Sequence, residues 1–239
     1  MKNILFLDIE TITQKADYYS LSKPWQEEWK RRAKKYAKAG EELPLTDKRA
    51  ATLYHEKAGL YAEFSQIVSI AVGFTAGTTV RIKTLIGTER EILQQFADIA
   101  GSHFNDPMKH CFCAHNGTGF DYPFMARRYV INRMPLPALL DISGKKPWET
   151  KHLLDTMDMW RFGDKAYISL NLLCLLFGIP TPKDGPVTGE NLSEYYWGAE
   201  SKAEAVKEIA AYNAEDVIAL ARVYCALKSL PQPEKIQMV

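Results

Sequence analysis

The stretch NILFLDIETIT, residues 3–13, runs a series of apolar residues into two carboxylates without a break. Its content of Ile, Leu and Phe is typical of a strand that is covered on both faces. Side chains two apart in a strand leave the same face, so Asp8 and Glu10 project together while Leu7 and Ile9 project to the other side. Two neighbouring half-buried carboxylates raise each other's proton affinity unless a cation neutralises them. Taken alone, the pair is equally well explained by a strand that ends at a solvated edge.

Length and composition limit the kind of protein. The chain has 239 residues, of which 46% are hydrophobic and 25% charged, so we expect a single large domain over 1–239 with an insertion inside it. It has no recognisable signal peptide and no apolar run of membrane-spanning length, which predicts a cytoplasmic protein without membrane contact. The four cysteines lack CxxC spacing and suit reduced core positions. The net charge of +1 gives no general attraction to a polyanion, although local basic clusters remain open.

The apolar pattern along the rest of the chain predicts a mixed five-stranded α/β sheet flanked by helices. Two apolar runs, 66–74 and 78–86, are joined by a Gly-containing turn and indicate an antiparallel hairpin. Three antiparallel strands are therefore expected, followed by parallel ones. The further strands are expected at 110–116 and within 151–160, and helices at 88–104, 119–132, 169–178 and 202–230.

Residues 22–59 form a helical insertion after the first strand. Gly40 and Pro44 divide it into two helices. A basic cluster at 30–35 interleaved with aromatic residues suits a nucleic-acid track. Helical periodicity somewhat favours the alternative, in which the aromatic residues pack inward and the charges are solvated. The aromatic residues concerned are Trp25, Trp29 and Tyr36.

Further acids lie at two other places. Asp121 follows a strand and a Gly-broken turn, which puts it in the first turn of the next helix. A capping box with Thr118 as the N-cap explains it as well. In the last helix Tyr212 and Asp216 are four residues apart and lie on the same face. Each of these features is unremarkable by itself, and only their combination carries weight.

Taken together, F-L-D-I-E-T at 6–11, N-x-x-x-F-D at 116–121 and Y-x-x-x-D at 212–216 resemble the three exonuclease motifs of the DEDD superfamily. The tyrosine points to the DEDDy branch, which includes the proofreading domain of family-B DNA polymerases. More closely, the chain looks like the stand-alone bacterial proteins described as predicted 3′-to-5′ exonucleases related to that domain. The resemblance covers the first strand and most of the chain from about residue 62 onward. It implies a ribonuclease-H-like fold and metal-dependent release of nucleotides from a 3′ end.

The resemblance also implies roles for five residues. Asp8 would contact two ions, Glu10 and Asp216 would help to bind the ion that carries the attacking water, and Asp121 would act on the second ion through waters. Tyr212 would orient the attacking water. The chemistry of the residues agrees, because hard oxygen ligands suit Mg²⁺ or Mn²⁺, and two such ions can hold both the attacking and the departing oxygen of a phosphoryl displacement.

Two residues are expected to contact the substrate, Thr11 through its backbone amide at the terminal sugar and Asn116 near the scissile phosphate. For several others a structural role competes with the functional one. These are Phe120 in base stacking, Asp155 and Asp158 beside the site, Lys183 at a phosphate, and His115, for which a structural hydrogen bond is favoured over metal binding.

The sequence therefore predicts a two-metal 3′-to-5′ exonuclease acting on single-stranded nucleic acid, DNA in the first place, and releasing nucleoside monophosphates. One alternative is a nucleic-acid-binding or polymerase-associated module that has lost catalysis, although all four acids remain. Another is an exoribonuclease, since contacts to the 2′-hydroxyl cannot be read from the motifs. The resemblance leaves open whether a separate DNA polymerase or repair factor is a partner.

Overall fold

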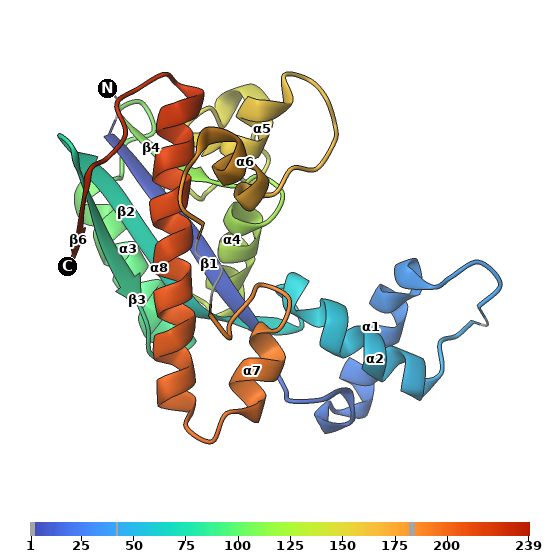
Figure 1. The fold of residues 1–239 in the computed structure, drawn as a ribbon. Coiled ribbons are helices and arrows are strands. Elements are labelled where there is room, and N and C mark those ends of the chain that lie inside the picture. Colours follow the sequence, from blue (N-terminus) through green and yellow to red (C-terminus); the bar gives the residue numbers. More distant parts are fainter. Residues whose placement is uncertain (1–2, 42, 182–184) are drawn as a thin grey trace.

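The computed structural model describes residues 3–41, 43–181 and 185–239, and these form a six-stranded mixed sheet (Figure 1). The strands are β1 Asn3–Thr13, β2 Ser65–Ala76, β3 Thr79–Leu85, β4 His110–Ala114, β5 Leu153–Asp155 and β6 Lys235–Met238. Their spatial order is β5-β4-β1-β2-β3-β6. The first three strands are antiparallel, whereas β4 pairs parallel to β1 and β5 pairs parallel to β4. Strand β1 is therefore central, with neighbours on both sides.

The expected architecture, three antiparallel strands followed by parallel ones with helices on both faces, is confirmed. The sixth strand was not expected. Strand β6 pairs parallel to β3, and all of its four residues are exposed. Its sequence, Lys-Ile-Gln-Met, alternates polar and apolar residues over only four positions, which is too short a run to stand out as a strand.

Helices cover both faces of the sheet. The principal helices are α3 Glu89–His103, α4 Asp121–Ile131 and α8 Lys202–Leu227. Leu5, Leu7 and Ile9 of β1 pack in one core with residues of α3 and α4, and Phe6 packs on the opposite face with residues of α8. Figure 1 accordingly shows α8 in front of the sheet and α3 behind it. The alternation of side chains along β1 thus gives each face its own core, and Asp8 and Glu10 lie on the α8 side.

Helix α8 approaches the sheet closely at Gly73 of β2. A Cβ atom there would lie 2.7 Å from Ile82 Cδ1 and 2.9 Å from Val217 Cγ1, so a larger residue would push the helix outward. The pairing of β1 with β2 also shifts register beside Glu10, and β2 carries the extra residue. As a result Val68 and Ser69 both contact residues of α8. The carboxylates of β1 and the side chains of α8 are brought together by this close packing.

The remaining helices are short. They are α5 Thr156–Arg161, α6 Leu170–Phe177, α7 Leu192–Gly198 and the 3₁₀ turns Tyr18–Ser20, Lys34–Tyr36, Ala58–Leu60 and Pro147–Glu149. The expected fifth strand within 151–160 is only three residues long, because Asp155 ends it and accepts a hydrogen bond from Met157 N as the N-cap of α5. Helix α7 was not expected from the sequence.

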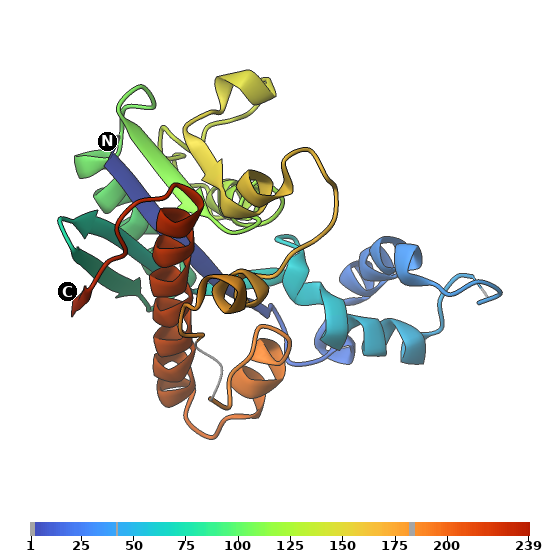
Figure 2. The ribbon, with the colours of Figure 1, turned by 45° about the horizontal axis from the view of Figure 1, so that its top comes forward.

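The insertion 22–59 contains α1 Lys23–Ala33 and α2 Asp47–Lys57, as expected, and it projects from the end of β1 (Figures 1 and 2). It has its own core, in which Trp29 is fully buried and donates a hydrogen bond from Nε1 to Ala50 O at 2.8 Å. The inward packing of this aromatic residue is therefore confirmed. Trp25 is 43% exposed and contacts Phe64 edge-to-face.

Two expectations from composition concern cysteines and membranes. All four cysteines are buried, as expected for core thiols. Within the described residues, no helix has the length and apolarity needed to cross a bilayer.

Candidate active site

Three carboxylates converge where α8 crosses β1. Asp8 and Glu10 project from β1, and Asp216 projects from α8; one ligand oxygen from each lies within 4.8 Å of the others. Glu10 is buried, with 6% of its surface exposed, and the other two are half-buried. The spacing of two along a strand and the packing of the helix on that same face together create this group, which we call the acid cluster.

Asp121 joins the acid cluster from the other side of β1. It is the first residue of α4 and is buried, and its Oδ1 accepts a hydrogen bond from Ile9 N at 3.2 Å. Because Ile9 lies between Asp8 and Glu10, this bond ties Asp121 to the strand at the level of both. The expected capping box is wrong, since α4 begins at Asp121, its N-cap is Phe120, and no side chain caps it.

Asp155 holds the turn that presents Asp121. Its carboxylate accepts hydrogen bonds from Asn116 N at 2.9 Å, Thr118 N at 3.0 Å and Thr118 Oγ1 at 2.8 Å. Asn116 has a φ of 61°, and a Cβ atom on Gly117 would lie 2.5 Å from Ala114 Cβ. The turn is thus fixed by its backbone and by a buried acid behind it, so Asp155 acts as a structural brace.

The buried setting of the acid cluster and the repulsion between its acids disfavour four negative charges at this site. Burial raises the pKa of Asp8 well above its usual value, and the charges of Asp121, Glu10 and Asp216 raise it further. The hydrogen bond from Asn213 offsets only part of this rise in pKa. Burial and the Asp216 and Asp121 charges likewise raise the pKa of Glu10. Burial raises the pKa of Asp121 to about 7, against the hydrogen bond from Ile9 N. Without a cation, these carboxylates are therefore difficult to ionise together at neutral pH.

The donor set fits a hard divalent cation. In the described part of the chain, Asp8, Glu10 and Asp121 form no ion pair with Lys or Arg. Close carboxylate oxygens are the ligands that Mg²⁺ and Mn²⁺ take, and a bound cation would relieve the repulsion that raises these pKa values.

Tyr212 lies one helical turn before Asp216 on α8. Burial, the charges of Asp216 and Glu10, and a hydrogen bond with Asp216 raise its pKa above the usual value. The phenol is therefore protonated at neutral pH and serves as a hydrogen-bond donor. A Cβ atom on Gly189 would lie 3.9 Å from Tyr212 Oη, so the segment 185–191 passes beside it.

Asn213 is a site residue that sequence reasoning missed. It is fully buried, and its Nδ2 donates a hydrogen bond to Asp8 Oδ2 at 2.6 Å. Ser69 Oγ donates to Asn213 Oδ1 at 2.9 Å. The available signal was a polar Asn on the apolar stripe that packs α8 against the sheet, between Tyr212 and Ala214.

The two expected substrate contacts lie at the rims of the site. Thr11 follows Glu10, is 8% exposed, and its Oγ1 donates to Gly59 O at 2.8 Å. Asn116 lies in the turn before Asp121, where its backbone N–H is bound by Asp155. Thr11 directly follows Glu10, and Asn116 lies five residues before Asp121 in the turn that leads into α4.

The remaining candidates have structural partners. The two ring nitrogens of His115 are within 2.9 Å of Thr156 Oγ1 and Ile168 O, as favoured from the sequence. Phe120 packs against Phe124, with ring centroids 5.2 Å apart. The others are Asp158, which accepts from Thr118 Oγ1 and pairs with Arg161, and Lys183, which lies outside the described residues.

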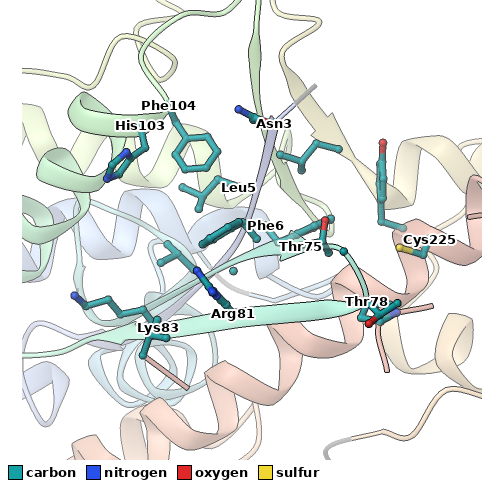
Figure 3. Close-up of a pocket in the computed structure, with 18 of the residues that line it drawn as sticks. Asn3, Leu5, Phe6, Thr75, Thr78, Arg81, Lys83, His103, Phe104 and Cys225 are labelled. Carbon is teal, nitrogen blue, oxygen red and sulfur yellow. The ribbon is translucent and has the colours of Figure 1, made fainter. Parts of the chain in front are cut away.

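A pocket of about 840 Å³ lies at the N-terminal end of β1, where Figure 3 shows Leu5 and Phe6 among its lining side chains. Its charged lining groups are Arg81 and Lys83 from β3, with His103 from α3 nearby. None of its described lining residues is Asp or Glu, so it offers no carboxylate to a divalent cation. The acid cluster, further along β1, is therefore the candidate catalytic centre.

Comparison with known proteins gives one family and a structural likeness. A family model described as a predicted 3′-5′ exonuclease related to the exonuclease domain of PolB matches residues 60–232. Among solved structures, the family B DNA polymerase from the hyperthermophilic archaeon Pyrobaculum calidifontis is similar, with a TM-score of 0.54 and 15% sequence identity. The likeness covers 92% of this chain and only 24% of that polymerase chain. No curated protein matches the chain.

The structural likeness supports the expected ribonuclease-H-like fold. The family match includes Asp121, Tyr212 and Asp216, whereas Asp8 and Glu10 precede the matched range. The sheet nevertheless brings all of these residues to one place, because β1 pairs with β2 and β4 inside that range. The chain belongs to the family of predicted 3′-5′ exonucleases related to the exonuclease domain of PolB.

Proposed function

We propose that this protein hydrolyses phosphodiester bonds from the 3′ end of single-stranded nucleic acid, DNA in the first place, and releases nucleoside monophosphates with two divalent ions. The observation that carries the proposal is the acid cluster, with ligand oxygens of Asp8, Glu10 and Asp216 within 4.8 Å of one another and Asp121 bound to the strand between them. Family membership supports the same reaction.

The four acids would hold two Mg²⁺ or Mn²⁺ ions. Asp8, the central acid, would reach both, Glu10 and Asp216 would share the ion on the water side, and Asp121 would serve the other. When bound, the ions supply Lewis-acid stabilisation to the attacking and leaving oxygens of an in-line displacement. Four carboxylates balance the charge of two such ions, which accounts for acids whose pKa values are raised in the metal-free chain.

Tyr212 orients the attacking water in this proposal. In the metal-free chain its pKa is raised, so its hydroxyl carries a proton and can position the water by hydrogen bonding. Thr11 and Asn116 are the proposed substrate contacts, Thr11 through its backbone amide, because its hydroxyl already donates to Gly59 O.

The test is digestion of 5′-labelled single-stranded DNA and RNA with Mg²⁺, Mn²⁺ or a chelator. Wild-type protein should give a metal-dependent ladder that shortens from the 3′ end, and Asp8→Ala should give none. Equal residual cleavage by the two proteins would show that the site is wrongly assigned. Faster cleavage of RNA than of DNA would instead change the proposed substrate and leave the mechanism standing.

A further inference from the structure

The charge of the chain is unevenly distributed. Residues 22–59, which we call the arm, contain ten Lys and Arg against six Asp and Glu, a net charge of +4. The rest of the chain has 20 basic and 23 acidic residues, a net charge of −3, so the overall +1 conceals two parts of opposite sign. The arm therefore carries the excess positive charge of the chain, and such an excess attracts a polyanion.

Several cations of the arm are not neutralised. The acids Glu27 and Asp47 pair with Lys30, Glu28 pairs with Arg31, and Glu41 pairs with Arg49. After these pairs, the exposed side chains that form no ion pair within the described residues include those of Lys34, Lys35 and Lys38. Three such cations are therefore presented to solvent close together in sequence, at the end of α1 and just beyond it.

Aromatic rings lie among these cations. Lys35 Nζ is 4.9 Å from the ring centroid of Tyr61, and Arg32 Cζ is 5.1 Å from the same centroid. Tyr36 Oη and Tyr61 Oη are 2.6 Å apart, which links the arm to the residues just after it. In proteins that bind single strands, cations contact the phosphate backbone and aromatic rings stack on the bases, so the two kinds of side chain together suit such a ligand.

The arm is attached next to the acid cluster. Thr11, which follows Glu10 in β1, donates a hydrogen bond to Gly59 O at 2.8 Å, and Lys15 N donates to Tyr54 Oη. Both views of the fold show the arm at this end of β1, on the side away from β3 and β6 (Figures 1 and 2). The family match begins at residue 60, so the arm is a feature beyond the matched exonuclease region.

We propose that the basic face around Lys34, Lys35 and Lys38 binds the phosphate backbone of the single-stranded substrate upstream of the 3′ end held at the acid cluster. The inference rests on the proposed function for the identity of its ligand. The hydrophobic core of the arm is compatible with this role, because Trp29 packs inside that core while the three lysines are exposed on the surface.

The test variant is Lys34→Glu with Lys38→Glu, which reverses two exposed charges without touching the Tyr36 and Tyr61 contacts. Its control is Lys83→Glu with Lys235→Glu, an identical change of net charge on exposed residues of β3 and β6. Binding of a labelled single strand of about 16 nucleotides is measured by fluorescence anisotropy with a chelator present, so the readout does not depend on cleavage.

The arm variant should weaken binding about tenfold or more, and the slope of log K against log salt should become shallower by about 1.4 for two lost phosphate contacts. The control should change binding much less. Equal weakening in both variants would mean that only total charge matters and would overturn the proposal. Unchanged binding in the arm variant would also overturn it and would favour an acidic protein surface as the partner of the arm.

Cleavage assays separate this inference from the proposed function. On a dinucleotide, which has almost no upstream backbone for the lysines to bind, the arm variant should keep the wild-type kcat/KM, whereas on the long strand its KM should rise. A matching loss on both substrates would place the lysines in the catalytic centre and refute their proposed role. If wild-type protein binds the long strand through the arm and cleaves neither substrate, the proposed function fails while the arm inference stands.

Discussion

The Asn213 amide has one orientation between its two partners. An ionised carboxylate only accepts hydrogen bonds, so Nδ2 faces Asp8, Oδ1 faces Ser69, and the Ser69 hydroxyl must donate. Ser69 and Asn213, both fully buried, thus hold one carboxylate oxygen of Asp8 in place. Since β2 supplies Ser69 next to its extra residue, the irregular pairing with β1 has a consequence for the site.

Asn213→Ala should therefore weaken metal binding and activity about 10- to 100-fold, as is usual when the partner of a metal ligand is removed. Calorimetric titration with Mn²⁺ and the dependence of kcat on metal concentration would measure the effect. Ser69→Ala, which keeps the bond to Asp8 but frees the amide to rotate, should cause a smaller loss. Should Asn213→Ala retain the wild-type metal affinity, Asp8 would not depend on this bond.

Tyr212→Phe removes only the hydroxyl beside Asp216. Because that hydroxyl is a donor with a raised pKa, we expect metal binding to be unchanged and kcat to fall about 10- to 100-fold. The pH–rate profile should keep its shape, because a hydroxyl that only donates a hydrogen bond adds no titration to the reaction. A full rate in Tyr212→Phe would remove the tyrosine from the mechanism.

At the scale of single residues, the sequence predicted the acids better than it predicted what surrounds them. Strand alternation puts Asp8 beside Glu10, and helical spacing puts Asp216 on the same face as Tyr212. The resemblance to the exonuclease motifs is what selected these residues as one site. Asn213 did not, because its two partners are 144 and 205 residues away in sequence and meet it only through the packing of α8 on the sheet. Long-range hydrogen bonds leave no local pattern to read.

At the scale of elements, the turn from β4 to α4 determines where Asp121 lies. Gly117 is required there, because a Cβ atom would lie 2.5 Å from Ala114 Cβ and 2.8 Å from the Tyr122 ring. The sequence predicted the strand, the Gly-broken turn and the helix. It could not predict that Asp155, 39 residues beyond Asn116, braces the turn, and so a capping box was expected in its place.

Gly117→Ala should destabilise the protein by about 1–3 kcal/mol and lower activity by moving Asp121. Thermal denaturation and the cleavage assay would measure the two effects. Gly101→Ala is the matched control, because Gly101 is exposed in α3 with nothing within 4 Å of a new Cβ atom, and alanine favours a helix there. Equal stability of the two variants would show that the turn can relax around a methyl group.

The elements that were missed share a physical cause. Strand β6 is exposed throughout and α7 is seven residues long with one buried residue, so neither carries a long apolar period. Longer elements with a buried face, such as α3 and α8, were predicted to within a few residues of their ends. An element can be predicted from sequence where a buried face requires apolar residues at regular spacing. It is missed where the element is short or exposed and its position depends on contacts with neighbouring elements.

At the scale of the whole molecule, the acid cluster makes stability depend on pH and metal together. The pKa of Asp121 is about 7 in the folded chain, and those of Asp8 and Glu10 are also well above their usual values. In the unfolded chain these acids titrate near pH 4. Between these values the folded chain binds more protons than the unfolded chain, so the free energy of unfolding falls as the pH rises.

The metal-free protein should accordingly have a lower Tm at pH 8 than at pH 5, by about 2–4 °C for each 1 kcal/mol lost in a chain of this size. Mg²⁺ or Mn²⁺ should restore stability at pH 8, because cations bind the folded cluster and not the unfolded chain. Asp8→Asn removes one of the opposed charges, so it should raise the metal-free Tm at pH 8 and reduce the gain from metal. Scanning calorimetry of both proteins with chelator or with metal measures these effects. A wild-type Tm that is the same at pH 5 and pH 8, and insensitive to metal, would mean that the four acids are not held together as the fold places them.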